Sequence, residues 1–224
     1  MNYTSVFDIM GPIMIGPSSS HTAGAARIGL FARRLFGKMP LEVEITLYGS
    51  FAKTYKGHAT DVALVGGLLN FETDDERIRQ SIGLAKAAGM EVRFILSDEE
   101  PRHPNTVLLK LRDGVEELDI MGESIGGGKM RITGIDTFEL TVPDQNPSLF
   151  VVAEKGKDVL TEVREVLENG NNPISNVEVA RNHGEIGALL ELKRKASAKT
   201  VAQLKQKIPD IIEIKSIGGA SDVS

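Results

Sequence analysis

The sequence predicts an α+β protein with two domains, and three observations lead to this prediction. Segments with helical periodicity and segments with strand-like alternation are mixed along the first part of the chain. The last part follows the order βαββαβ, which is the ferredoxin-like arrangement. Between them lies a polar segment with two prolines, Pro143 and Pro147. We therefore predict a mixed α/β domain of the substrate-binding type at residues 1–145 and a ferredoxin-like domain at residues 148–224.

The composition is that of a globular protein with an aliphatic core. Hydrophobic residues make up 41% of the 224 residues, aromatic residues 5%, and there is no Trp. The net charge of −5 argues against binding to nucleic acid, which requires clustered Lys and Arg. The N-terminus does not resemble a signal peptide, and no apolar run reaches the ~18 residues of a membrane span. We expect a soluble cytoplasmic protein with no membrane partner.

The chain contains no Cys. Disulfide bonds and thiolate chemistry are therefore excluded, and thiols give no information about the redox compartment. The spacing of His21, His58 and His103 matches no local metal-binding motif. We expect no metal site within this chain.

In the first domain, the period of the apolar residues predicts helices and strands in turn. The first helix spans residues 24–36 and ends at Gly37 and Pro40. The next element is a half-buried strand at 42–48, followed by a polar stretch with glycines at 49–60. We expect further helices at 61–69 and 74–88 and further strands at 91–96, 106–111, 116–124 and 130–142.

Several turns and caps of this domain are predicted from single residues. Thr60 is expected to cap the helix at 61–69, and Gly89 to end the helix at 74–88. Ile82 is expected to face inward on that second helix, together with Ile78 and Ala85. The pair Asp113-Gly114 predicts a hairpin turn.

The second domain is predicted in the same way. Strands and helices alternate in the ferredoxin-like order over residues 149–153, 158–168, 174–181, 185–192, 200–208 and 211–217. His183 lies in the turn between the second and third of these strands, where a surface position is expected.

A serine-rich segment that contains His21 precedes the first helix. Backbone N–H groups and the hydroxyls of Ser18, Ser19 and Ser20 could together hold an anion at the helix N-terminus. Because the segment has no Lys, it is not a Walker A loop, and an amino-acid carboxylate fits better than a triphosphate. The alternative is simple helix capping by Ser20 or Thr22.

The second histidine segment, Gly49 to Asp61, joins a strand to a helix. Loops at the carboxyl ends of strands are frequent ligand sites in α/β sheets. His58 could act as a base, because an unperturbed His titrates near pH ~6.5. Asp61 could orient His58, or it could simply lie in the first helical turn and favour the helix dipole. The alternative for His58 is a solvated surface position.

The third segment is His103-Pro104-Asn105-Thr106. Pro104 restricts His103 to an extended conformation, which would project its ring from the loop. Taken alone, this pattern favours a solvated loop over a site residue. Three polar loops that each carry a His flank regular elements of one domain, however, and we expect them to converge at one edge.

The first domain resembles the β chain of iron–sulfur L-serine dehydratases. The resemblance covers residues 1–145, and the run Gly16-Pro-Ser-Ser-Ser-His21-Thr22 is its most specific motif. The remaining part resembles an ACT domain, a regulatory module that often binds amino acids. The other segments that carry the resemblance are Ser5-Val6-Phe7-Asp8, Gly57-His58-Ala-Thr60-Asp61, His103-Pro-Asn-Thr106 and Ser124-Ile-Gly-Gly-Gly128.

The resemblance implies a lyase reaction of serine catabolism and gluconeogenesis. L-Serine would undergo β-elimination to aminoacrylate and end as pyruvate and ammonia. The family uses a [4Fe–4S] cluster as a Lewis acid on the leaving hydroxyl, and cluster iron requires thiolate ligands. A chain without Cys would therefore depend on a partner α chain that carries the cluster.

Within this reaction, our main hypothesis assigns roles to residues. His58 would take the α-proton of serine, because its loop is flanked by Gly and Asp61 lies nearby in the sequence, while His21 and His103 would orient serine or stabilise developing charge. Ser18, Ser19 and Ser20 would hold its carboxylate. The further substrate-binding residues are expected to be Thr22, Thr60, Asp61 and Asn105. The ACT-like domain would provide a route to homo-oligomers.

Two other functions are compatible with the same residues. The chain could be a purely regulatory subunit in which both domains sense serine and neither performs chemistry. It could also be a stand-alone amino-acid-binding module without an enzyme partner.

Overall fold

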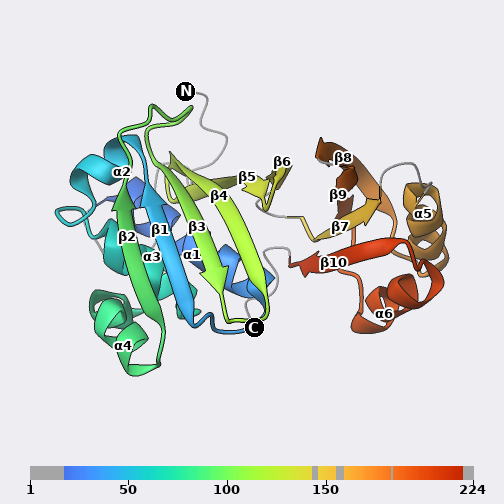
Figure 1. Ribbon diagram of the computed structural model, residues 1–224, viewed down its shortest axis with the longest axis horizontal. Coiled ribbons are helices and arrows are strands. Elements are labelled where there is room, and N and C mark those ends of the chain that lie inside the picture. The colour runs from blue at the N-terminus through green and yellow to red at the C-terminus, as the bar shows by residue number, and fades with distance from the viewer. Residues whose placement is uncertain (1–17, 143–145, 155–158, 183, 219–224) are drawn as a thin grey trace, which may run out of the picture. The chain divides into compact units, whose positions relative to one another are not determined.

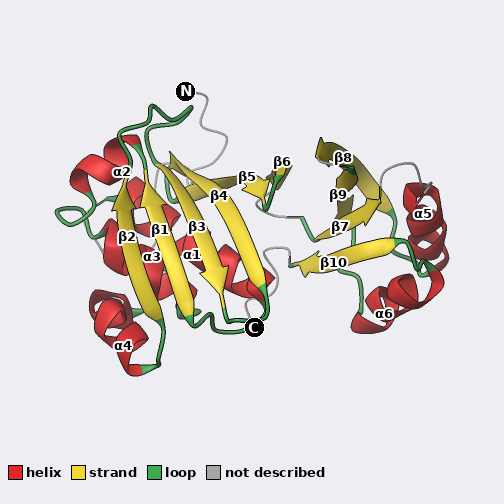
Figure 2. Cartoon of the chain, viewed as in Figure 1, coloured by secondary structure: helices red, strands yellow, loops and turns green. Residues whose placement is uncertain are grey.

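The computed structural model describes residues 18–142, 146–154, 159–182 and 184–218. The chain divides into two compact units, Met1–Asp136 and Thr137–Ser224. Both contain helices and strands, so the predicted α+β class is confirmed (Figure 1; Figure 2). The predicted domain ranges, 1–145 and 148–224, stay a prediction, because residues 143–145 of the expected boundary lie outside the described residues.

The first unit is built on a mixed β-sheet. Strand β1 lies parallel to β2 and antiparallel to β3, and β4 is antiparallel to both of its neighbours, β3 and β5. The order across this unit is β2-β1-β3-β4-β5. The strands are β1 (Glu42–Leu47), β2 (Glu91–Leu96), β3 (Thr106–Arg112), β4 (Glu117–Gly126) and β5 (Lys129–Ile135).

One face of this sheet is covered by helices α1 and α3 (Figure 1). These two helices pack so closely that a Cβ at Gly67 of α3 would lie 2.1 Å from the carbonyl oxygen of Ala26 in α1. The fully buried side chains of Ile28, Leu64 and Ile45 belong to the core between helices and sheet. The helical elements of this unit are η2 (Ser19–Ala23), α1 (Gly24–Phe36), α2 (Gly49–Thr54), α3 (Thr60–Leu68), η3 (Glu76–Gln80) and α4 (Ser81–Ala87).

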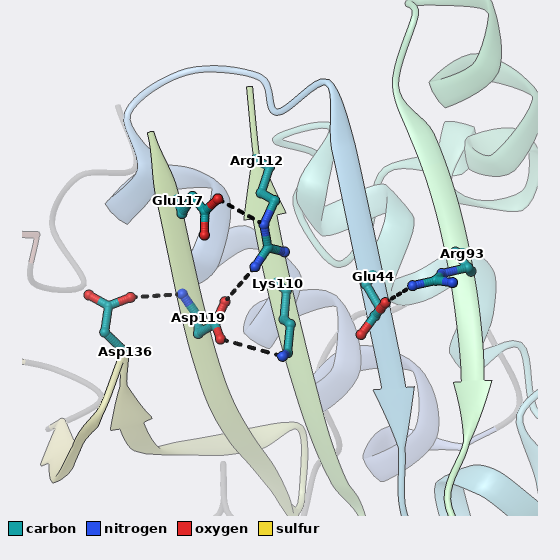
Figure 3. A network of polar contacts seen from close by, with 7 residues as sticks. All are labelled: Glu44, Arg93, Lys110, Arg112, Glu117, Asp119 and Asp136. Carbon is teal, nitrogen blue, oxygen red and sulfur yellow. Dashed lines mark hydrogen bonds and ion pairs between the residues drawn. The ribbon is translucent and has the colours of Figure 1, made fainter. Parts of the chain in front are cut away.

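The opposite face of the sheet carries charged side chains at alternate positions of β1 to β4. Figure 3 shows these side chains in ion pairs: Glu44 with Arg93, Arg112 with Glu117, and Lys110 with Asp119. A carboxylate oxygen of Asp136 also accepts a hydrogen bond from the backbone N–H of Asp119, at 2.9 Å. Exposed pairs of this kind contribute only ~0–1 kcal/mol each to stability, so the buried face supplies most of the stability of the sheet.

The second unit has the predicted ferredoxin-like arrangement. After β6, its elements follow the order βαββαβ, and the sheet order is β10-β7-β9-β8 with antiparallel neighbours. Its core includes Leu149, Val163 and Leu190. Phe138 of β6 is buried and packs edge-on against Phe150 of β7, with ring centroids 5.9 Å apart. The elements are β6 (Phe138–Val142), β7 (Ser148–Glu154), α5 (Val159–Asn169), β8 (Ile174–Asn182), β9 (Glu185–Leu192), α6 (Ala198–Lys207) and β10 (Ile211–Ile217).

Four expectations about individual elements or residues are wrong. The polar stretch at 49–60 contains the short helix α2, and the single strand expected at 130–142 is two strands, β5 and β6. The break between them falls at Asp136, whose φ of 51° cannot continue a strand. The helix expected at 74–88 begins as the 3₁₀ turn η3, and Ile82, expected to face inward, is 41% exposed.

Other expectations are confirmed or lie outside the described residues. Gly89 follows α4 with a φ of 84°, and Gly114 turns the β3–β4 hairpin. His183 and residues 1–17 are not among the described residues, so the resemblance motif Ser5-Val6-Phe7-Asp8 and the first two residues of the serine-rich motif lie outside them. Within the part of the chain that the structure describes, no helix is long and apolar enough to cross a membrane.

Candidate functional site

The serine-rich segment forms a single π-helical turn, η2, that continues directly into α1. The side chain of Ser18 caps this turn by accepting a hydrogen bond from the His21 N–H, at 3.3 Å. The N–H of Gly24 donates to the carbonyl of Ser19, and the hydroxyl of Thr22 donates to the carbonyl of Ser18. The expected cap at Ser20 or Thr22 is therefore wrong, because the helical structure begins earlier than the apolar pattern indicates.

Hydroxyl groups surround the imidazole ring of His21. Its Nδ1 lies 3.1 Å from the Ser20 hydroxyl and 3.3 Å from the Ser18 hydroxyl, while its Nε2 lies 3.2 Å from the hydroxyl of Ser50. A hydroxyl can donate or accept, so it satisfies either nitrogen of a neutral imidazole. Both ring nitrogens of His21 are thus engaged by uncharged groups.

His58 lies beside His21, with ring centroids 4.9 Å apart. The Nδ1 of His58 is 3.4 Å from the carbonyl oxygen of Thr54. Because a carbonyl oxygen can only accept, this contact requires the proton on Nδ1 and leaves Nε2 of the neutral ring as an acceptor. The side chain of His58 is exposed, whereas that of His21 is half-buried.

The electrostatics of the pair favour a neutral His21. Burial lowers the pKa of His21 below its usual value of 6.5, and the nearby His58 lowers it further through charge repulsion. A proton on one ring therefore opposes a proton on the other. His58 is the ring of the pair that has an available acceptor nitrogen.

Two predicted residues, Thr60 and Asp61, open helix α3. A carboxylate oxygen of Asp61 accepts from the N–H of Val62 at 2.8 Å, and burial raises the pKa of this carboxyl above its usual value. The contact to Nδ1 of His58 comes from Thr54 rather than from Asp61. Thr60 does not cap the helix as expected, since the N-cap position is Ala59. Among the described residues, the buried hydroxyl of Thr60 has no hydrogen-bond partner.

The loop with His103 and Asn105 is joined to the site through its backbone. The carbonyl of Pro104 accepts from the N–H of Ser50 at 2.6 Å, and the ring Nδ1 of His103 accepts from the N–H of Asn105 at 3.2 Å. The amide of Asn105 donates to the carbonyl of Ser124 at 3.4 Å, while its buried Oδ1 has no partner within the described residues. The structure thus places this loop at the site but holds the His103 ring by local contacts.

Ser124 at the end of β4 ties the loop to the serine-rich turn. Its N–H donates to the carbonyl of Asn105 at 2.9 Å, and its hydroxyl donates to the carbonyl of Ser20 at 2.7 Å. This approach requires Gly24, because a Cβ at that position would lie 1.9 Å from the Ser124 hydroxyl oxygen. The end of β4, the π-helical turn and the 103–106 loop are therefore fixed to one another.

The sequence did not single out Ser50, Thr54 or Ser124 as site residues. Each belongs to a polar, glycine-containing segment, and this composition was the only feature of the sequence that pointed to them. Their roles depend on contacts between segments far apart in the chain, such as the contact between Ser124 and Ser20. Local pattern does not contain that information.

The donor set of this chain does not fit an iron–sulfur cluster. Cluster iron is held by thiolates, and the sequence has no Cys. Within the described residues, no group of three or more His, Asp or Glu side chains is arranged to hold a metal ion. The cluster of His21 and His58 is instead a set of proton donors and acceptors.

The comparisons with known proteins agree on one family. The family model "Serine dehydratase beta chain" matches residues 5–133. A Bacillus subtilis protein named "Probable L-serine dehydratase, beta chain" is 46% identical over 97% of this chain and 99% of its own length. The "L-serine dehydratase, beta chain" of Peptoniphilus asaccharolyticus is 40% identical over 80% of this chain and 81% of its own length.

A further relative is a longer protein. The "L-serine dehydratase" of Streptomyces coelicolor is 36% identical over 55% of this chain, but this similarity covers only 32% of its own length. The range matched by the family model, residues 5–133, includes His21, His58 and Ser124, which the structure brings together. The chain belongs to the serine dehydratase beta-chain family, the family of a lyase subunit.

Proposed function

We propose that this chain is the β subunit of a two-chain, cytoplasmic L-serine dehydratase and contributes the cluster of His21 and His58 to its active site. The names of the Bacillus and Peptoniphilus relatives support a separate β chain. The Streptomyces relative supports a partner, because two thirds of that dehydratase have no counterpart in the segment matched here. We infer that an α chain supplies this missing part.

The reaction is a β-elimination. A base takes the α-proton of L-serine, the β-hydroxyl leaves as water, and aminoacrylate remains. Its tautomer, an imine, reacts with water to give pyruvate and ammonia, so serine yields these two products without net uptake of water.

One observation carries the assignment of the base. His58 uses Nδ1 in its contact with Thr54 and keeps Nε2 as an acceptor on an exposed ring. His21 beside it has both nitrogens engaged by hydroxyls and a lowered pKa. His58 therefore takes the α-proton, and the neutral His21 orients serine or stabilises developing charge together with His103. General base catalysis of this kind typically contributes ~10²–10⁴-fold to a rate.

The polar groups around the pair provide the substrate contacts of this proposal. The hydroxyls of Ser18, Ser19 and Ser20 bind the carboxylate of serine at the start of the π-helical turn, and Thr22 supports this turn by donating to the carbonyl of Ser18. The buried Thr60 hydroxyl and the Asn105 Oδ1 lack protein partners within the described residues, which leaves them available to the substrate. Asp61 completes this set at the first turn of α3.

The [4Fe–4S] cluster of the family is proposed to have its ligands on the α chain. The absence of Cys from this chain supports that division of labour. The residues described above bind substrate and move a proton, and they perform these roles without contributing a ligand to the cluster.

The fold of the second unit supports an additional, regulatory role for this chain. Its ferredoxin-like order of elements is also that of ACT domains. We propose that residues 148–224 form an ACT-like regulatory domain that joins β subunits into a homo-oligomer. In the purely regulatory alternative, the His21 and His58 cluster would sense serine, and its variants would change KM or activation and leave kcat intact.

The test uses the complete enzyme. The chain is co-expressed with the cognate α chain, purified without oxygen, and assayed for pyruvate from L-serine. His58→Ala should lower kcat by about 10²-fold or more. His183→Ala, a histidine variant in the second unit, is the matched control and should retain activity.

Two outcomes would overturn the proposal. Conversion of serine by this chain alone would contradict the need for an α chain. A kcat of His58→Ala within a few-fold of the wild-type value would show that His58 is not the base, and a change confined to KM would support the regulatory alternative.

A further inference from the structure

Ser50 is the residue at which the separate segments of the site meet. Its hydroxyl contacts Nε2 of His21 at 3.2 Å, and its N–H donates to the carbonyl of Pro104 at 2.6 Å. Its carbonyl accepts from the hydroxyl of Thr54 at 2.8 Å, and the carbonyl of Thr54 in turn contacts the ring of His58. A single residue thus connects the π-helical turn, the 103–106 loop and the segment that carries His58.

The backbone geometry shows why Ser50 reaches this position. Strand β1 ends at Leu47, and the chain turns sharply at Gly49, whose φ is 53°. A side chain at Gly49 is excluded, because a Cβ there would lie 2.7 Å from the carbonyl oxygen of Pro104. Helix α2 therefore starts directly against the 103–106 loop and turns the Ser50 hydroxyl toward His21.

The contact with Ser50 determines what His21 can do. The ring of His21 has hydroxyls on both sides, Ser18 and Ser20 at Nδ1 and Ser50 at Nε2. Without the Ser50 hydroxyl, Nε2 would lose its hydrogen-bond partner, and the ring would be held only by its Nδ1 contacts and by packing against the rings of Phe51 and His58. The contact with Ser50 therefore restricts the orientation of the ring, because it fixes the Nε2 side toward the start of α2.

We propose that Ser50 is a positioning residue of the active site that acts through His21. This inference rests on the proposed function, since it assigns Ser50 to the same site. By holding Nε2 of His21, Ser50 keeps the ring beside His58 and directs its Nδ1 toward the serine hydroxyls that bind the substrate carboxylate. Ser50 itself does not touch the reacting atoms.

The first measurement is a double-mutant cycle in the α plus β enzyme. Ser50→Ala should lower kcat/KM by about tenfold, the factor expected for the loss of one uncharged hydrogen bond. Because Ser50 acts through His21, the same change in a His21→Ala background should cost less than about twofold. Ser50→Thr keeps the hydroxyl and should restore most of the activity, and Ser148→Ala removes a buried serine of the second unit as a control.

The second measurement needs no activity. In the full β chain alone, the ¹⁵N shift of His21 Nε2 should be the same in the wild type and in Ser50→Thr, because both keep the hydroxyl that contacts this nitrogen. In Ser50→Ala the Nε2 shift should change, because its hydrogen-bond partner is lost, while the Ser148→Ala spectrum should match the wild type. Thermal unfolding of each variant identifies any that fails to fold; if Ser50→Ala fails, Ser50→Cys, with a thiol that hydrogen-bonds only weakly, replaces it in both measurements.

The outcomes separate this inference from the proposed function. Equal losses from Ser50→Ala in both backgrounds, or an unchanged ¹⁵N shift of His21 Nε2, would refute the positioning role of Ser50. An α plus β enzyme that does not convert serine would refute the proposed function, and the ¹⁵N shifts would then decide the role of Ser50 on their own.

Discussion

The rings of His21 and His58 lie with their centroids 4.9 Å apart, although His21 belongs to a π-helical turn and His58 to the segment between α2 and α3. Two imidazoles at this distance do not act independently. A positive charge on either ring disfavours a positive charge on the other. Burial disfavours the protonated form of His21 further, so the pKa of His21 is lowered. The pair therefore accommodates one proton far more readily than two.

The first prediction concerns the pH dependence of stability. Because the pKa of His21 is lowered in the folded chain, the unfolded chain binds this proton more readily. Above pH 6.5 the residue is neutral in both states and has no effect. As the pH falls below 6.5, protonation favours the unfolded state, so the free energy of unfolding decreases until the pH lies below the folded pKa.

Urea unfolding of the wild type and of His21→Gln between about pH 8 and pH 5 measures this effect. The wild type should lose more stability on acidification than the variant does. Parallel curves for the two proteins would show that His21 has the same proton affinity in both states. Since the ring is only half-buried, solvent screening keeps the difference modest.

The second prediction concerns the close approach of Gly24 and Ser124. In Gly24→Ala the new methyl group would overlap the Ser124 hydroxyl, so the contact with the Ser20 carbonyl must break or the turn must move. We expect a loss of about 1–3 kcal/mol in the free energy of unfolding, measured with urea. Serine turnover should fall with it, because the turn carries His21.

Two further variants test the cause of that loss. Ser124→Gly in the Gly24→Ala background removes the overlapping atoms and should recover part of the stability. Gly83→Ala is the control, since a Cβ at this helical position meets no atom within 4 Å. It should stabilise the chain by roughly 0.5–1 kcal/mol. A similar loss in Gly83→Ala would contradict the steric explanation.

The third prediction compares two arginines that pair with carboxylates of different burial. Arg131 donates through Nε to Glu123 at 3.0 Å, and the side chain of Glu123 is only 6% exposed. Arg131→Ala would leave a buried carboxylate without its partner and should cost about 2–4 kcal/mol. Arg93, which is 74% exposed, pairs with Glu44 on the open sheet face, and Arg93→Ala should cost less than about 1 kcal/mol. Equal losses in chemical unfolding would contradict this ranking.

Periodicity predicted most of the fold because the sheet of the first unit is buried on one face only. Val43, Ile45 and Leu47 are buried while the residues between them are not, so β1 shows the alternation of a half-buried strand. Helix α1 likewise buries one stripe of side chains, including Ile28 and Leu35. Where buried residues recur at a regular spacing, the apolar residues of the sequence show the same spacing.

The elements that sequence reasoning missed have no such period. Helix α2 is only six residues long, and just Phe51 of it is buried. The break at Asp136 depends on one backbone angle and on the carboxylate contact with the Asp119 N–H. In the site, the polar loops were found from composition, but the contacts of Ser50 and Ser124 join segments that only the folded chain brings together.

The π-helical turn at Ser19–Ala23 sets a constraint on the length of the chain at this point. Such a turn holds one residue more than an α-helical turn in the same place. Removing a single residue from it would let α-helical winding continue toward the N-terminus and rotate the preceding side chains by about 100° around the helix axis. The register between α1 and His21 would then be lost, so an insertion or deletion at this turn should impair the site more than a substitution does.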